Sequence, residues 1–187
     1  MAKRKGLVIV YTGDGKGKTS AALGAAMRAL GHGWKVLIIQ FFKGDWPVVY
    51  GELELAKKLH PQFEVLQLGK GFVKIMGDKK PLKEHQAAAA NALKTAEKKI
   101  LSGKYDLVVL DEVLCALDSA GVKLISAKDL IALLKKTPRG TSVILTGRLG
   151  NIVLKKQVFA QADLVTEMKE IKHPFQKGIT AKKGIDY

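Results

Sequence analysis

Residues 12–20 read Thr12-Gly13-Asp14-Gly15-Lys16-Gly17-Lys18-Thr19-Ser20, and they join an apolar run to an alanine-rich segment. This order predicts a strand, a glycine-rich turn and a helix. Glycines let backbone N–H groups turn inward around phosphate oxygens, in conformations that a Cβ atom would obstruct. The start of the helix adds free N–H groups and the positive end of its dipole. The stretch therefore predicts a phosphate-binding loop, or P-loop.

The side chains of this loop have separate expected roles. Lys18 is expected to reach phosphate oxygens as a point charge, and the Thr19 hydroxyl is placed to ligate Mg²⁺. The usual pattern G-x-x-x-x-G-K-[ST] begins with glycine where this chain has Thr12, so an unusual placement of the phosphates is expected. The alternative is a glycine-rich turn with an incidental lysine. The predicted nucleotide-binding residues of the loop are Gly13, Asp14, Gly15, Lys16, Gly17, Lys18, Thr19 and Ser20.

Short apolar runs alternate with segments of helical spacing along the rest of the chain. Strands are expected at 7–10, 36–42, 63–68, 107–110, 142–146 and 164–168. Helices are expected at 18–30, 51–59, 83–101, 127–136 and 151–160. Strands that are apolar on both faces and joined by helices indicate a mostly parallel sheet covered on both sides. We therefore expect a single three-layer α/β domain over residues 1–187, with a six-stranded sheet of the P-loop NTPase (RecA-like) type and an irregular C-terminal tail, 169–187, packed on it.

Composition narrows the class of protein. The apolar runs are far too short to span a bilayer, and the basic N-terminus leads into a strand rather than a cleavable signal. The single cysteine, Cys115, excludes an internal disulfide and fits a reducing compartment, so a cytoplasmic protein is expected, with this thiol in the core. The net charge of +15 favours anionic partners. Nucleic acid is not favoured, because the lysines are dispersed without a stripe of interleaved aromatics.

Two further strands end in polar residues. The run 107–110 is followed by Asp111 and Glu112, the arrangement by which P-loop proteins bring an acid to Mg²⁺. Successive strand residues point to opposite faces, so one of the two is expected to ligate the metal, and the sequence leaves open which. Arg148 follows the fifth strand at the edge where open α/β sheets bind ligands, and is either a phosphate contact or a solvated surface residue. His32 and His85 lack metal-ligand spacing and are interpreted, with His60, as structural.

Several motifs together carry a family resemblance over nearly the whole chain. They are residues 12–20, Gln40-Phe41-Phe42-Lys43-Gly44-Asp45-Trp46-Pro47, Gly71-Phe72, residues 108–112 and 143–148, Ala162-Asp163, Lys172-His173-Pro174-Phe175 and Gly184-Ile185-Asp186-Tyr187. In these motifs the chain resembles the ATP:corrinoid adenosyltransferases of the P-loop type. The Phe-Lys-Gly-x-Trp-Pro segment and the Gly-Ile-Asp-Tyr ending make the resemblance specific.

The resemblance implies a reaction and its participants. A corrinoid reduced to Co(I) attacks the ribose C5′ of ATP and triphosphate leaves, so ATP and a corrinoid are the substrates. Mg²⁺ or Mn²⁺ is the implied cofactor, with Thr19 and Glu112 as its ligands beside Asp111. The triphosphate looks to be held in the reverse sense to other P-loop proteins. Arg28 falls in a matching stretch and is assigned to nucleotide binding on that ground. A reductant such as a flavoprotein and a homodimer are the implied protein partners.

Phe72 matches a family aromatic that pushes away the lower ligand of cobalt, so the resemblance implies a catalytic role for Phe72 beside Lys18. The chain departs from the family two residues later, where Lys74 stands in place of tryptophan. The first strand begins at residue 7, so the family's N-terminal covering segment is expected to be missing. Two other functions stay open at this point: a P-loop ATPase acting on nucleic acid, and a non-catalytic nucleotide or corrinoid carrier.

Overall fold

The computed structural model describes residues 5–44, 48–75, 77–118 and 121–187. Its strands are β1 (Val8–Thr12), β2 (Val36–Gln40), β3 (Phe63–Gln67), β4 (Leu107–Asp111), β5 (Ser142–Thr146) and β6 (Leu164–Glu167). Its α-helices are α1 (Lys18–Gly31), α2 (Gly51–Leu59), α3 (Leu82–Leu101), α4 (Val113–Leu117), α5 (Ala127–Lys136) and α6 (Ile152–Phe159). The six strands and five longer helices confirm the expected alternation. The short α4 and a 3₁₀ turn at Pro174–Lys177 were not expected.

The strands form one sheet in the order β3-β2-β4-β5-β1-β6. Every pairing between these strands is parallel, so the sheet goes beyond the mostly parallel arrangement expected. The carboxyl ends of the strands therefore meet at one edge, which we call the carboxyl edge, and the opposite side is the amino edge. The loop after β1 lies at the carboxyl edge beside the ends of β4 and β5.

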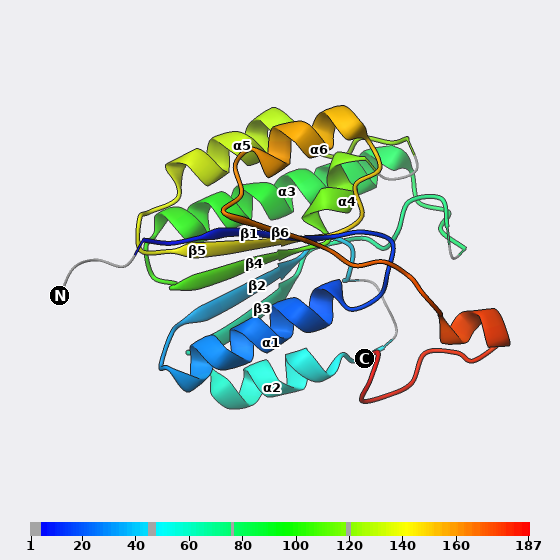
Figure 1. The fold of residues 1–187 in the computed structure, drawn as a ribbon, viewed down its shortest axis with the longest axis horizontal. Helices are drawn as coiled ribbons and strands as arrows, with labels where there is room; N and C mark the ends of the chain where they lie inside the picture. Colours follow the sequence, from blue (N-terminus) through cyan, green and yellow to red (C-terminus); the bar gives the residue numbers. More distant parts are fainter. Residues whose placement is uncertain (1–4, 45–47, 76, 119–120) are drawn as a thin grey trace.

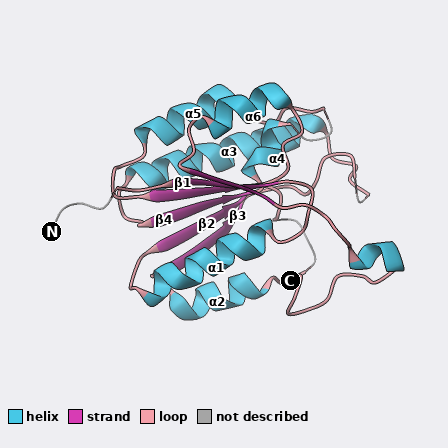
Figure 2. Ribbon diagram, viewed as in Figure 1, coloured by secondary structure: helices cyan, strands magenta, loops and turns pink. Residues whose placement is uncertain are grey.

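Helices cover both faces of the sheet, as Figures 1 and 2 show. Helices α1 and α2 lie on one face, and α3, α4, α5 and α6 lie on the other. Helix α1 packs through Ala22, Ala26 and Ala29, which are buried and spaced four and three residues apart. Alanines at this spacing place a smooth helical stripe against the strands, because 3.6 residues make one turn. This packing holds the start of α1 against the sheet and aims it at the carboxyl edge.

The last strand and the tail depart from the expectation of strands buried on both faces. Strand β6 forms one edge of the sheet, and its four residues are exposed. The chain then leaves the sheet, makes the 3₁₀ turn and returns to the carboxyl edge near α1 and α2 (Figure 1). None of the helices in the described ranges is both long and apolar enough to cross a membrane.

Candidate functional site

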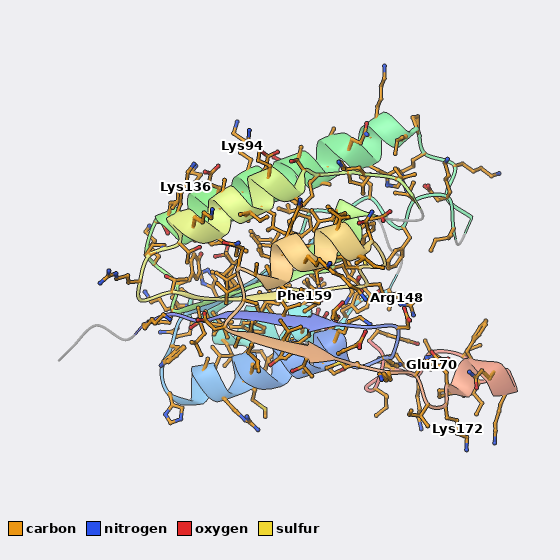
Figure 3. The ribbon with its side chains drawn as sticks, turned by 45° about the horizontal axis from the view of Figure 1, so that its top comes forward. Lys94, Lys136, Arg148, Phe159, Glu170 and Lys172 are labelled. Atoms are coloured by element: carbon orange, nitrogen blue, oxygen red, sulfur yellow. The ribbon has the colours of Figure 1, made fainter. Side chains whose placement is uncertain are left out.

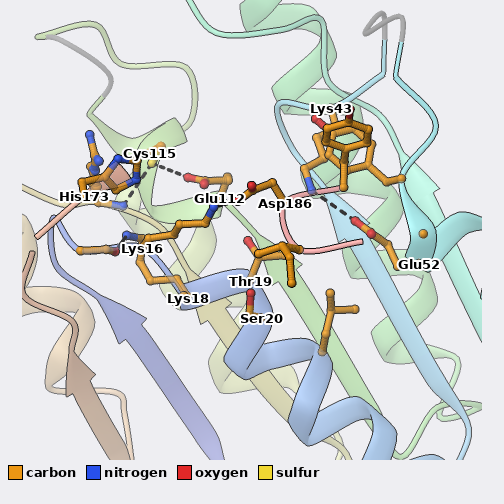
Figure 4. Close-up of a pocket in the computed structure, with 18 of the residues that line it drawn as sticks. Lys16, Lys18, Thr19, Ser20, Lys43, Glu52, Glu112, Cys115, His173 and Asp186 are labelled. Carbon is orange, nitrogen blue, oxygen red and sulfur yellow. Dashed lines mark hydrogen bonds and ion pairs between the residues drawn. The ribbon is translucent and has the colours of Figure 1, made fainter. Parts of the chain in front are cut away.

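A cavity of about 600 Å³ opens at the carboxyl edge of the sheet. The P-loop and the start of α1 form its floor, and the ends of β4 and β5 contribute Glu112 and Arg148. The segments after β2 and β3 contribute Lys43 and Phe72, and the tail closes another side through residues 184–187. Figure 4 shows Lys18, Lys43 and Glu112 converging from elements that are far apart in the sequence. The cavity is therefore assembled by the topology of the sheet.

The P-loop has the backbone form that its glycines predict. Gly13 and Gly17 have φ values of 97° and 112°, a region that side chains rarely adopt. The N–H of Gly15 donates to the carbonyl of Met168 at 2.8 Å, and a Cβ atom at Gly15 would lie 2.7 Å from the backbone of Lys169. The backbone at Met168 and Lys169, just after β6, thus passes too close to the P-loop for any residue larger than glycine at position 15.

Lys18 lies inside the loop rather than in solvent. Its Nζ donates to the carbonyl oxygens of Gly13 at 2.8 Å and Gly15 at 2.7 Å, and only 7% of the residue is exposed. Burial lowers the pKa of Lys18, an effect that the nearby Glu112 carboxylate opposes. A desolvated ammonium held only by neutral carbonyls is suited to bind an anion that enters the loop.

Asp111 lies beneath the cavity and is fully buried. Its Oδ1 accepts hydrogen bonds from the hydroxyls of Thr19, at 2.8 Å, and Thr146, at 2.7 Å. The Nε2 of Gln40 approaches Oδ2 at 3.4 Å, and the Nζ of Lys43 is 3.9 Å away from it. Asp111 therefore orients the Thr19 hydroxyl from behind and lies outside the lining of the cavity.

Glu112, the next residue, faces the cavity because the chain turns sharply after β4. Its φ of 64° is left-handed, and its N–H donates to the Thr146 hydroxyl at 2.8 Å. One carboxylate oxygen accepts a hydrogen bond from the Cys115 thiol at 2.8 Å. Burial raises the pKa of Glu112, and the adjacent Asp111 raises it further. The two acids are thus separated by the turn that follows β4, because the strand ends at Asp111 and Glu112 lines the cavity.

The donors at this point fit Mg²⁺ or Mn²⁺. Within the described ranges, no three His, Cys, Asp or Glu residues are grouped to form a complete metal cage. Mg²⁺ does not require one, because it keeps several waters and is held by one or two carboxylates plus substrate phosphates. The Thr19 hydroxyl and the Glu112 carboxylate are hard oxygen donors that line the same cavity as the P-loop. The residues present therefore fit a cation that arrives with a nucleotide.

The two predicted arginines are placed differently. Arg148 lines the cavity, and its Nη2 donates to the carbonyl of Asp14 at 3.0 Å. Figure 3 shows Arg148 and Glu170 at the carboxyl edge, away from Lys94 and Lys136 on the helical layer. Arg28 lies exposed in the last turn of α1 and does not line the cavity. Of the predicted nucleotide-binding residues, Arg28 is the one that the fold leaves well apart from the others.

An aromatic wall faces the phosphate-binding residues. The rings of Phe72 and Phe42 stack with centroids 5.1 Å apart and an interplanar angle of 21°. Phe72 and Ile75 line the cavity from the loop between β3 and α3. The cavity therefore combines cationic and apolar side chains. Trp46, part of the family-like motif, lies outside the described residues, which omit 45–47.

Some cavity residues have no role in the sequence-based prediction. The Lys43 Nζ lies 3.2 Å from the Glu52 carboxylate and 3.9 Å from the centroid of the Tyr50 ring. Burial raises the pKa of Tyr50, and the Lys43 charge opposes that shift. Tyr50 and Glu52 could not be recognised as cavity residues from the sequence, because they lie at the start of an ordinary amphipathic helix. Only the fold turns the start of α2 toward the P-loop.

Cys115 and the C-terminal tail also contribute to the cavity. Cys115 packs against the core, as expected, and it also lines the cavity, where its thiol donates to Glu112 and its sulfur accepts the Arg148 backbone N–H at 3.1 Å. The tail places Asp186 in an ion pair with Lys16 of the P-loop. His173 also lines the cavity, and its Nδ1 accepts the N–H of Phe175 at 3.2 Å. The tail motifs quoted for the family resemblance were the available signal for these contacts.

Similarity to a solved structure agrees with the fold. The flagellar accessory protein FlaH from Methanocaldococcus jannaschii superimposes with a TM-score of 0.59 and 14% identity, covering 88% of this chain and 71% of that chain. At this identity the likeness concerns the architecture alone. It is consistent with a P-loop domain of the RecA-like type.

Sequence comparison is more specific. The corrinoid adenosyltransferase of Escherichia coli K12 is 35% identical over 185 residues, which span 98% of this chain and 86% of the relative. Corrinoid adenosyltransferase CobA of Salmonella typhimurium is 36% identical over 188 residues, 99% of this chain and 87% of the relative. The family model described as ATP:corrinoid adenosyltransferase BtuR/CobO/CobP matches residues 4–187. These matches over nearly the whole length show that the chain belongs to the ATP:corrinoid adenosyltransferase family.

Proposed function

We propose that this protein transfers the 5′-deoxyadenosyl group of ATP to the Co(I) centre of a corrinoid, in adenosylcobalamin biosynthesis or salvage. The cobalt supplies the electron pair of the new Co–C5′ bond, and the C5′–O5′ bond breaks as triphosphate leaves with its electron pair. The observation that supports this reaction best is that the P-loop and Phe72, whose ring stacks on the buried Phe42, line the same cavity.

The proposed roles of the P-loop side chains follow from charge and position. Since the attacking group belongs to the substrate, the protein needs no nucleophile or base, and it acts by positioning and by charge stabilisation. Lys18 and Arg148 offer positive charge to the departing triphosphate. Lys16 becomes available to the same anion if Asp186 releases it. The glycine N–H groups and Ser20 complete the phosphate cradle.

We propose that Thr19 and Glu112 hold the divalent cation, with Asp111 orienting Thr19. When bound, Mg²⁺ or Mn²⁺ supplies positive charge that neutralises the triphosphate leaving group. Asp111 accepts the Thr19 hydroxyl proton in a hydrogen bond, which leaves the lone pairs of that oxygen free to face the cavity. The dry position of Asp111 keeps this arrangement rigid.

Phe72 is proposed to act on the corrinoid. Its ring is braced by Phe42, so it can press on the face of a tetrapyrrole and disfavour the lower ligand of cobalt without yielding. A flavoprotein reductant that supplies the Co(I) state, a homodimeric assembly and a cytoplasmic location complete the proposal. Arg28, exposed on α1, is retained as a nucleotide contact only within such an assembly.

One experiment tests the function directly. Purified protein is mixed with MgATP and a cobalamin kept as Co(I) by a strong reductant, and the corrinoid spectrum is followed in the dark and after illumination. The expected result is a light-sensitive cobalt–carbon product with one triphosphate released per adenosyl group transferred. Release of phosphate stimulated by DNA, or binding of ATP and corrinoid without product, would replace the proposal with an ATPase or a carrier.

A further inference from the structure

The loop that carries the aromatic wall is fastened firmly at its first end. The N–H of Gly71 donates to the carbonyl of Phe42 at 2.9 Å. A Cβ atom at Gly69 would lie 2.4 Å from the Cα atom of Phe42, so the two backbones touch at this point. Phe72 and Ile75 follow directly and line the cavity. The position of these two side chains then depends on what holds the other end of the loop.

At the second end of the loop, before α3, the Asp78 carboxylate accepts several hydrogen bonds. Its Oδ2 accepts the backbone N–H of Lys74 at 2.9 Å, and its Oδ1 accepts that of Lys80 at 3.2 Å. The same Oδ2 lies 3.0 Å from the Nε2 of His85, in the first turn of α3. Because an ionised carboxylate only accepts hydrogen bonds, His85 donates this one. The loop is therefore tied both to itself and to a long helix of the core.

The setting makes this connection strong. His85 is 2% exposed, and the Asp78 side chain is 8% exposed, so water competes little for the bond. Lys74 has a φ of 58°, a left-handed conformation that is unfavourable for a residue other than glycine. The hydrogen bond from its N–H to Asp78 holds it there. If Asp78 or His85 is replaced, the backbone at Lys74 is expected to relax, and the neighbouring side chains of Phe72 and Ile75 are no longer held in position.

The connection is separate from the nucleotide side of the cavity. The hydrogen bonds of Asp78 described above all end within residues 74–85. Lys18 and Thr19, in contrast, are held by the carbonyls of the P-loop and by Asp111 at the end of β4. A change at Asp78 therefore reaches Phe72 and Ile75 first and leaves the phosphate-binding residues in place.

We infer that Asp78 and His85 form a positioning pair that holds the side chains of Phe72 and Ile75 in place to contact the corrinoid. This inference rests on the proposed adenosyl transfer. Neither Asp78 nor His85 is among the residues that line the cavity. The pair affects the affinity for the corrinoid, and it has no part in binding ATP.

Four variants test the pair: Asp78→Ala, His85→Ala, His85→Gln and the control Glu97→Gln. Glu97 lies on the same helix and pairs with Lys136 at 3.0 Å, so its variant removes an ion pair far from the cavity. Loss of a hydrogen bond to a charged group is expected to raise the KM for cobalamin about tenfold in Asp78→Ala and His85→Ala, with the KM for ATP unchanged. His85→Gln keeps an N–H donor and is expected to restore most of the affinity.

A second measurement does not depend on catalysis. Amide hydrogen exchange of residues 72–80 is expected to speed up in Asp78→Ala and His85→Ala, and to stay at the wild-type rate in Glu97→Gln. Equal changes in the KM values for ATP and cobalamin, or unaltered exchange in this segment, would overturn the pair's role. If Asp78→Ala does not fold, the comparison of His85→Ala with His85→Gln decides the matter. A wild-type protein with no transfer activity would refute the proposed function, and spectral titration with cobalamin would then replace the KM comparison.

Discussion

The carboxyl edge and the amino edge of the sheet each carry a cluster of charged side chains. The two clusters differ in whether each charge has an oppositely charged partner in contact. At the carboxyl edge, burial lowers the pKa of Lys18 and raises that of Glu112, so both groups are pushed toward their neutral forms. At the amino edge, Lys99 lies 2.7 Å from the Glu64 carboxylate, and the Tyr105 hydroxyl donates to the same group. Hydrogen bonding to Glu64 raises the pKa of Lys99.

The same contrast holds for the acids. Burial alone would raise the pKa of Glu64, but the hydrogen bonds from Lys99 and Tyr105 outweigh it and hold that pKa below its usual value. The Glu112 carboxylate accepts a hydrogen bond from the Cys115 thiol. The charges of Lys18 and Lys43 lower its pKa, but burial and Asp111 outweigh them. A cluster that is complete within the protein serves stability, whereas a desolvated and incompletely matched cluster in a cavity is typical of a ligand site. This contrast supports the proposal that the ligands bind at the carboxyl edge of the sheet.

The largest expected effect comes from removing the charge at the carboxyl edge. Lys18→Ala deletes a charge-assisted phosphate contact worth about 1.5–3 kcal/mol, so kcat/KM for ATP is expected to fall at least about tenfold. Steady-state kinetics with varied ATP measures this. Lys94→Ala, which removes an exposed lysine from α3, is the matched control and is expected to behave as the wild type. Unchanged ATP kinetics in Lys18→Ala would remove Lys18 from the nucleotide site.

The next effect separates the two sides of the cavity. Phe72→Ala removes the stacking on Phe42, worth about 0.5–1.5 kcal/mol, and is expected to slow the reaction that starts from Co(II) about 2- to 13-fold. With chemically supplied Co(I) at saturating cobalamin, kcat is expected to stay unchanged, because Phe72 is proposed to assist reduction. The two assays are run in parallel on one preparation. Equal losses in both would make Phe72 a packing residue.

The smallest effect is expected at the amino edge and concerns stability alone. A partly exposed ion pair contributes about 0.2–1 kcal/mol, so Glu64→Gln is expected to lower the free energy of unfolding by about that amount at pH 7. Because the folded-state pKa of Glu64 is depressed, its contribution is present above the unfolded-state pKa and disappears as the pH falls through the folded-state pKa.

Urea unfolding of the wild type and Glu64→Gln between about pH 3 and pH 7 measures this dependence. The two curves are expected to converge at the acid end, below the ordinary glutamate pKa of about 4.3. Glu54→Gln, at the exposed pair with Lys57, serves as the control and is expected to change stability less. Transfer kinetics at pH 7 are expected to be the same in all three proteins. A kinetic defect in Glu64→Gln would mean that the amino edge is coupled to the site.

Local pattern was sufficient to predict much of this molecule. The apolar runs and helical spacings specify the strands and long helices, because alternation and 3.6-residue periodicity act over a few residues. The P-loop glycines are predictable for the same reason, since their φ values are a local property. The missed α4 spans only Val113–Leu117, too short for a periodic signal, and the exposure of β6 follows from its place at the sheet edge rather than from its own residues.

By itself, the sequence determined the parallel α/β fold, the phosphate-binding loop and the family, because each depends on short runs of residues whose pattern is local. Only the tertiary structure decided that Glu112 faces the cavity while Asp111 lies beneath it, that Cys115 and the tail reach the site, and that Arg28 stays away from it. The same holds for His85, interpreted from sequence as structural, whose partner Asp78 belongs to an aperiodic loop. These outcomes depend on strand order, backbone turns and burial, which arise from contacts between segments that the chain brings together only when it folds.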